Sequence, residues 1–103
     1  MSDLTIAKKK ENDKLIVTAE GRIDTATSPQ LDEEVKSAMA DIRELVIDFG
    51  KVSYISSSGL RVLLSFHKSM DLKGGKLIIK NPTDMVLEVF EVTGFSDILN
   101  IEK

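Results

Sequence analysis

Residues 44–80 read ELVIDFGKVSYISSSGLRVLLSFHKSMDLKGGKLIIK, and this stretch decides the fold. Its first apolar run, LVI, predicts a buried strand over 44–49, because a strand covered on both faces is apolar at successive positions. We expect a helix over 60–72 that ends at Gly74–Gly75. Residues 76–80, built on three aliphatic side chains, predict the next strand. This order indicates two parallel strands joined by a helical crossover.

The residues before this stretch predict a hairpin and a first helix. Apolar and polar residues alternate over 4–10, the sequence Glu-Asn-Asp at 11–13 is a turn signal, and residues 14–19 predict a second strand. Thr27 or Ser28 is expected to cap the helix, since Pro29 suits its first turn, where a missing N–H costs nothing.

The residues after it predict a third helix and a last strand. Asn81–Pro82 is expected to open the helix, and Gly94 to end it. Its predicted buried face comprises Met85, Val86, Val89 and Phe90. Residues 98–101 can add a short strand.

The predicted fold is therefore α/β, with the order β-β-α-β-α-β-α-β. We expect a mostly parallel sheet with an antiparallel N-terminal hairpin and with helices packed on it. The length of 103 residues predicts a single domain over 1–103.

Composition narrows the function classes. The chain has no cysteine, which excludes disulfides, thiolate metal sites and a cysteine nucleophile, and a net charge of −3 gives no electrostatic support for nucleic-acid binding. No glycine-rich phosphate loop is present, so we expect no cofactor. With His67 as the single histidine and no cysteine, we also expect no metal site. No apolar stretch is long enough to span a bilayer, and the N-terminus lacks signal-peptide features, so we expect a cytoplasmic protein without a membrane partner.

Residues 54–61, YISSSGLR, place three hydroxyls where the central strand gives way to a helix. One serine can cap the helix, which contributes about 1 kcal/mol, but a cap does not explain three. The other hypothesis is that one serine is phosphorylated, because a helix start presents free N–H groups and a positive dipole end that tolerate a phosphate. Such a phosphate adds nearly two negative charges and can abolish a partner interface. The cap and the phosphate readings both stay open on these residues alone.

The chain resembles a STAS domain of the anti-sigma-factor antagonist type over nearly its whole length. Ser57–Leu60 resembles that family's phosphorylation loop, which usually reads Asp-Ser-Ser or Asp-Ser-Thr followed by Gly-Leu. Gly21–Asp24 resembles its Gly-Glu-Leu-Asp segment. Further segments that resemble the family are Val46–Phe49, Gly74–Gly75 and Phe90–Phe95.

The resemblance implies site residues. The family's phosphoacceptor lies two residues before the glycine, which is Ser57 here. Because Ser56 stands where the family usually has Asp, Ser56 and Ser58 remain alternative acceptors. The implied partner-binding surface comprises Asp24, Ser56, Ser57, Ser58, Gly59, Leu60 and Arg61.

The resemblance also implies a function. An anti-sigma-factor antagonist binds an anti-sigma factor that is also a serine kinase, which frees a sigma factor. The kinase then phosphorylates the loop serine with its own ATP, the complex dissociates, and a serine phosphatase resets the system. This chain would be a substrate of enzymes and not an enzyme, and we expect a monomer.

Three alternatives stay open. The chain could be an unphosphorylated STAS scaffold or ligand-binding module. A receiver-like domain phosphorylated at Asp48 lacks the acidic pair that would hold Mg²⁺ after the first strand. A serine hydrolase would need His67 as its base, yet that histidine lies about 15 Å along the helix axis from Ser57.

Overall fold

The computed structural model describes residues 3–103. Its strands are β1 (Leu4–Glu11), β2 (Lys14–Ile23), β3 (Glu44–Ile55), β4 (Lys76–Lys80) and β5 (Asn100–Glu102). Its helices are α1 (Ser28–Lys36), α2 (Ser57–Leu72), α3 (Asp84–Thr93) and the short 3₁₀ helix η1 (Phe95–Asp97).

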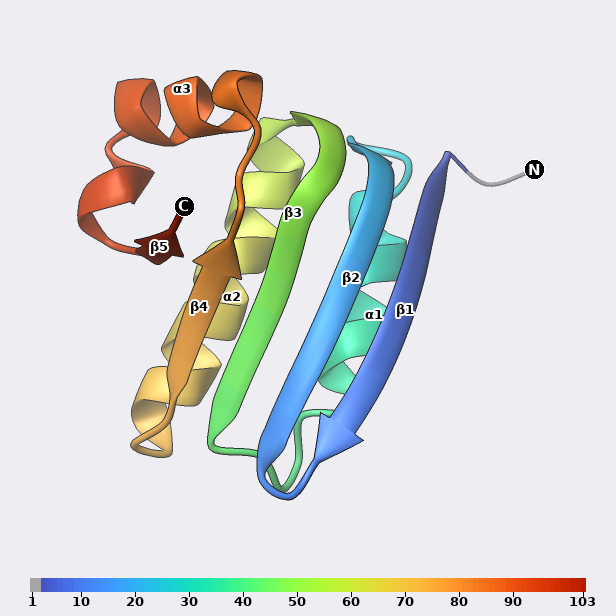
Figure 1. Cartoon of the computed structure of the whole chain (residues 1–103), viewed down its shortest axis with the longest axis vertical. Coiled ribbons are helices and arrows are strands. Elements are labelled where there is room, and N and C mark those ends of the chain that lie inside the picture. Colours follow the sequence, from blue (N-terminus) through green and yellow to red (C-terminus); the bar gives the residue numbers. More distant parts are fainter. Residues whose placement is uncertain (1–2) are drawn as a thin grey trace.

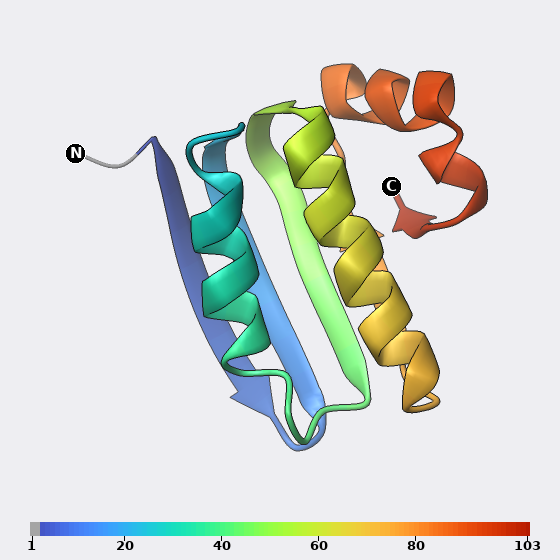
Figure 2. The same ribbon diagram turned by 180° about the vertical axis from the view of Figure 1, so that it is seen from behind.

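The five strands form one sheet in which their spatial order equals their order in the chain (Figure 1). Strand β1 is antiparallel to β2, and β2 to β5 are mutually parallel. The predicted α/β fold with an antiparallel N-terminal hairpin is therefore confirmed. Helices α1 and α2 lie side by side on one face of the sheet, whereas α3 crosses the end of the sheet (Figure 2). Within residues 3–103 no helix or strand covers the opposite face.

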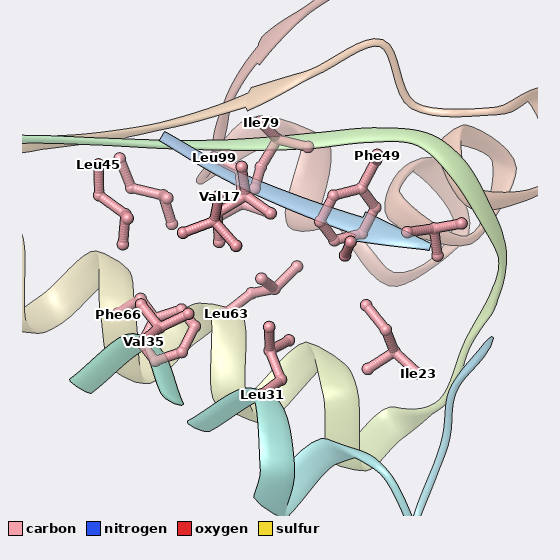
Figure 3. Close-up of a cluster of buried hydrophobic side chains, with 14 of the residues drawn as sticks. Val17, Ile23, Leu31, Val35, Leu45, Phe49, Leu63, Phe66, Ile79 and Leu99 are labelled. Carbon is pink, nitrogen blue, oxygen red and sulfur yellow. The ribbon is translucent and has the colours of Figure 1, made fainter. Parts of the chain in front are cut away.

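The hydrophobic core lies between the sheet and these two helices (Figure 3). Val17, Leu45 and Ile79 project from neighbouring strands toward the helices and are fully buried. Leu31 of α1 and Phe66 of α2 meet them from the other side. Each such apolar side chain contributes roughly 1.5–3 kcal/mol on burial, so this layer stabilises the packing of both helices against the sheet.

Strand β3 is longer than predicted and runs to Ile55 instead of residue 49. Its register with β2 shifts twice, between Thr18 and Glu20 and again between Gly21 and Arg22. Each shift places an extra β3 residue opposite β2, and such bulges bend a strand without ending it. The bent strand therefore delivers the chain directly to the serine triplet.

Helix α3 also differs from its prediction. Thr83, and not Asn81–Pro82, opens it, because the Thr83 hydroxyl accepts a hydrogen bond from the Val86 N–H (3.4 Å). Val86 and Phe90 are fully buried, but Met85 is 57% exposed, so its predicted place in the core is wrong. Residues 86 and 90 are four positions apart and share the helix face that meets the sheet, whereas Met85 points away from it.

Strand β1 forms one edge of the sheet and carries three consecutive lysines. Lys8 lies 3.8 Å from Glu34 of α1, and Lys10 pairs with Asp41 in the connection that follows α1. Lys9, between them, is exposed.

No helix in the described part of the chain is both long and apolar enough to cross a membrane.

Candidate functional site

Two loops meet at the carboxyl end of the sheet because β2 and β3 are neighbouring parallel strands. Their last paired residues are Ile23 and Ile55. The Ser56 N–H donates to the Ile23 carbonyl (2.8 Å), which ties the serine triplet to the loop after β2. Across the two loops the hydroxyls of Thr25 and Ser58 lie 3.5 Å apart. This edge is where parallel α/β folds place their sites.

The three serines have different environments. Ser56 is the N-cap of α2, since its backbone is extended (φ −92°, ψ 173°) and its hydroxyl accepts from the Gly59 N–H (3.2 Å). Ser58 is half-buried beside Thr25. Ser57 is exposed, and its side chain makes no hydrogen bond within residues 3–103. The cap therefore belongs to Ser56, and the Ser57 hydroxyl has no structural task in the described chain.

This division predicts different stabilities for two alanine variants. Ser56→Ala should lower the free energy of unfolding by about 1 kcal/mol, because it leaves the Gly59 N–H without its cap. Ser57→Ala should change that free energy by less than about 0.5 kcal/mol, as surface substitutions usually do. Urea unfolding followed by circular dichroism measures both. Equal losses in the two variants would contradict the assignment of the cap.

Gly59 and Leu60 were expected on the partner-binding surface, but both are buried. A Cβ atom at Gly59 would lie 2.7 Å from Ile23 Cγ2 and 2.7 Å from Ile55 Cγ1. The absence of a side chain therefore lets α2 start close against the ends of β2 and β3. We assign these two residues to the packing beneath the surface and not to the surface itself.

Asp24 organises the loop after β2. Its Oδ1 accepts from the N–H groups of Ala26 (2.9 Å) and Thr27 (3.0 Å), and Arg22 Nε lies 3.7 Å from Oδ2. The Thr27 N–H, above all, holds the pKa of Asp24 below its usual value, with the Thr27 hydroxyl, the Ala26 N–H and Arg22 acting in the same direction and burial opposing them. Asp24 therefore stays ionised and fixed beside the serines.

Thr27 was expected to cap α1, and it does occupy the N-cap position. Its hydroxyl accepts from the Asp24 N–H (2.8 Å) and donates to the Arg22 carbonyl (2.8 Å), and makes no capping bond to α1. The hydroxyl thus stabilises the loop and not the helix.

Titration of Asp24 should reflect these bonds. We expect its midpoint, measured by NMR of the labelled carboxyl carbon, to fall below the usual value of about 3.9. Since the folded pKa is the lower one, the stability that Asp24 contributes is present above its unfolded pKa and is lost as pH falls through the folded pKa. Thr27→Val removes the hydroxyl, which can also donate to Asp24 Oδ1 (3.2 Å), and should therefore raise the Asp24 midpoint. The midpoint of Asp41, whose pKa Lys10 lowers, should not change. A wild-type Asp24 midpoint at or above the usual value would contradict this account.

Two residues of the site were missed in the sequence. The Arg22 guanidinium carbon lies 4.6 Å from the centre of the Tyr54 ring, and the Arg22 side chain is 54% exposed. A cation over an aromatic face is an attractive arrangement. The two residues are direct neighbours in the β2–β3 register, beyond both bulges. Only knowledge of that shifted register could have placed them together.

Arg61 is exposed, as expected, and follows Ser57 by one helical turn. Leu64, although apolar, lines the same hollow on the outer face of α2 as Arg61. The core face of α2 is made by Leu60, Leu63, Phe66 and Met70.

Asp48 and His67, the residues of the alternative hypotheses, lie in different parts of the fold. Asp48 Oδ1 accepts from the Gly50 N–H (2.8 Å), and Asn81 Nδ2 lies 3.5 Å from Oδ2. His67 is half-buried on the same helix as Ser57 and three turns away from it. Among residues 3–103, no three His, Asp or Glu side chains gather in a group that could hold a metal ion.

Comparison with known proteins places this geometry in context. The family model for the STAS domain matches residues 5–103. An anti-sigma-B factor antagonist from Listeria monocytogenes is 32% identical over 98 residues, covering 92% of this chain and 84% of that protein. The structure of the anti-sigma factor antagonist SpoIIAA in its unphosphorylated form matches with a TM-score of 0.83 at 18% identity, covering 96% and 89% of the two chains. The phosphorylated form of the Bacillus cell fate determinant SpoIIAA matches with a TM-score of 0.75 at 17% identity, covering 96% and 92%.

Proposed function

This chain belongs to the STAS domain family, and we propose that it is an anti-sigma factor antagonist switched by phosphorylation of Ser57. In its unmodified form it binds an anti-sigma factor and so releases a sigma factor. The name of the Listeria relative supports the antagonist activity, because that protein is 32% identical over almost the whole chain. The structural similarity to SpoIIAA, which is known in a phosphorylated form, supports a switch of this kind.

The exposure of Ser57 is the observation that carries the proposal. Ser57 alone among the three serines is exposed, and Ser56 is occupied as the cap of α2. A phosphate at the first residue of α2 lies at the positive end of the helix dipole, so the fold tolerates it. The same dianion would have to lose its water in an interface, and burying a charge without a partner is costly.

The docking surface that we propose is built from both loops and from the start of α2. It comprises Arg22, Asp24, Ser56, Ser57, Ser58 and Arg61. Two of its charged side chains are held in place, Arg22 by Tyr54 and Asp24 by the loop N–H groups. A preformed surface loses less conformational freedom on binding, which favours affinity.

The proposed partners are an anti-sigma factor that is also a serine kinase and a phosphatase that removes the phosphate. The chain then has a binding role and takes part in the chemistry only as a substrate. Because sigma factors act on RNA polymerase, the proposed place of action is the cytoplasm.

Phosphosite mapping tests the proposal. The protein and serine variants of it are incubated with ATP and the anti-sigma kinase of the same organism, and phosphopeptides are analysed by mass spectrometry. We expect one phosphate on the wild type and on Ser58→Ala, and none on Ser57→Ala. A complex with the anti-sigma factor that forms without any phosphorylation would support an unmodified scaffold, and absence of both binding and phosphate would refute the proposed function.

A further inference from the structure

The outer face of α2 carries one continuous stripe that begins at Ser57. Residues 57, 61, 64, 68 and 72 are spaced by three or four positions, so they lie on a single helix face. The stripe is hollowed, and the hollow is lined by Arg61, Leu64, Ser65, Lys68, Ser69 and Leu72. The proposed phosphoacceptor therefore lies one helical turn before Arg61, the first residue that lines the hollow.

The charge of this stripe is opposite to that of the rest of the chain. The chain has 17 acidic and 14 basic residues, whereas α2 contains two basic residues, Arg61 and Lys68, and one acidic residue, Asp71, which does not line the hollow. Helix α1 carries three acidic residues and one lysine, and α3 carries three acidic residues and no basic one. Both basic side chains of the stripe line the hollow. A partner that fits here must present negative charge.

The hollow also has an apolar end. Leu72, at the last residue of α2, is 89% exposed and is the most exposed large apolar side chain among the described residues. Leu64, two turns earlier, is half-buried in the same hollow. A single exposed leucine needs no explanation, but two leucines that flank Lys68 in one hollow offer an apolar seat between basic groups.

We propose that this hollow receives an acidic segment of the anti-sigma factor, with carboxylates facing Arg61 and Lys68 and apolar side chains packed on Leu64 and Leu72. The inference rests on the proposed function, because it extends the docking surface at the serines along α2. It also gives phosphorylation a second effect. A phosphate on Ser57 lies one turn from Arg61, so it neutralises that guanidinium and repels the partner's carboxylates.

Photo-crosslinking locates the partner on this surface. A benzoylphenylalanine replaces Ser65 or Leu72 in the hollow, Thr25 in the loop beside the serines, or Lys36 on the exposed side of α1 as the control. The variants are irradiated in cells that express the chain natively, and the crosslinked peptides are sequenced. We expect positions 65 and 72 to capture the same protein as position 25, through a peptide with net negative charge, and position 36 to capture none.

The outcomes separate the two proposals. If positions 25, 65 and 72 all capture a protein of another class, the proposed function is wrong, and the inference that the anti-sigma factor occupies the hollow is wrong with it. If the anti-sigma factor is captured at position 25 alone, or at 65 and 72 through a basic peptide, the inference is wrong and the proposed function stands. A second copy of this chain at 65 and 72, or no crosslink at any position, overturns the inference.

Charge reversal in the hollow gives a quantitative check with the purified partner. Lys68→Glu should weaken binding about ten-fold at low salt, since it replaces an attraction by a repulsion, and higher salt should reduce that difference. Lys36→Glu makes the same change on α1 and should bind like the wild type. Leu72→Ser should also weaken binding, without a dependence on salt. Equal affinities of Lys68→Glu and Lys36→Glu would contradict the proposal.

Discussion

Ser57→Asp should bind the anti-sigma factor at least about a hundredfold more weakly than the wild type. An unpaired carboxylate that loses its water in an interface costs several kcal/mol, which corresponds to two or more orders of magnitude in affinity. The fold should not suffer, because an acidic residue in the first turn of α2 interacts favourably with the helix dipole. Isothermal titration calorimetry measures the affinity, and urea unfolding confirms that stability is retained.

Ser57→Asn is the matched control for this variant, because it has nearly the same size and no charge. We expect it to keep most of the affinity. Equal weakening by Asp and Asn would show that the size of the side chain decides the effect, and the argument from charge would then fail.

Phe90→Ala should lower the free energy of unfolding by about 3–5 kcal/mol, which is typical of removing a buried aromatic ring. Phe90 is fully buried, and its ring lies 6.1 Å from that of Phe49 on β3, at an interplanar angle of 49°. This contact ties α3 to the end of the sheet. Removal of the ring leaves a cavity there and should loosen α3 as a unit, which hydrogen exchange of its amides would detect.

Val92→Ala is the control on the same helix. Val92 is 79% exposed, so the change should cost less than about 0.5 kcal/mol. If the two variants lose similar amounts of stability, α3 is not packed on the sheet through Phe90.

Local signals in the sequence predicted the order and type of the elements. Pro29 in the first turn of α1 and Gly94 at the end of α3 act as expected. Gly94 adopts the left-handed conformation (φ 83°) that ends a helix and that glycine adopts without strain. The hairpin turn follows from a short-range pattern, and the parallel direction of the later strands follows from their alternation with helices.

Features set by contacts between distant residues could not be predicted in this way. The bulges that carry β3 past Gly50 to Ile55 depend on its pairing with β2, which lies about thirty residues earlier in the chain. The stack of Arg22 on Tyr54 follows from that shifted register. Met85 was misplaced because the orientation of α3 is fixed by the packing of Phe90 on Phe49 and not by the helix's own pattern.

Only the features of the candidate site that depend on local sequence could be predicted. The serine triplet and Asp24 are local motifs, so they could be singled out as residues. The roles within the triplet could not, because the cap is decided by the Ser56 backbone at the end of β3. The position of Leu64 beside Arg61 depends on the rotation of α2 about its axis relative to the sheet. The apolar side chain of Leu64 would by itself indicate a place in the core.

The lysines of β1 protect this edge of the sheet against pairing with another chain. An edge strand offers unpaired backbone N–H and C=O groups to any other chain with an exposed strand, and such pairing propagates into aggregates. Another chain that docked along β1 would have to bring its backbone past the ammonium groups of residues 8–10, two of which are anchored to acidic groups of α1 or of the connection that follows it. At the opposite edge β5 has only three residues and offers little length for pairing. Both edges of the described sheet are thus poor templates for pairing, so the chain should resist edge-to-edge aggregation at high concentration.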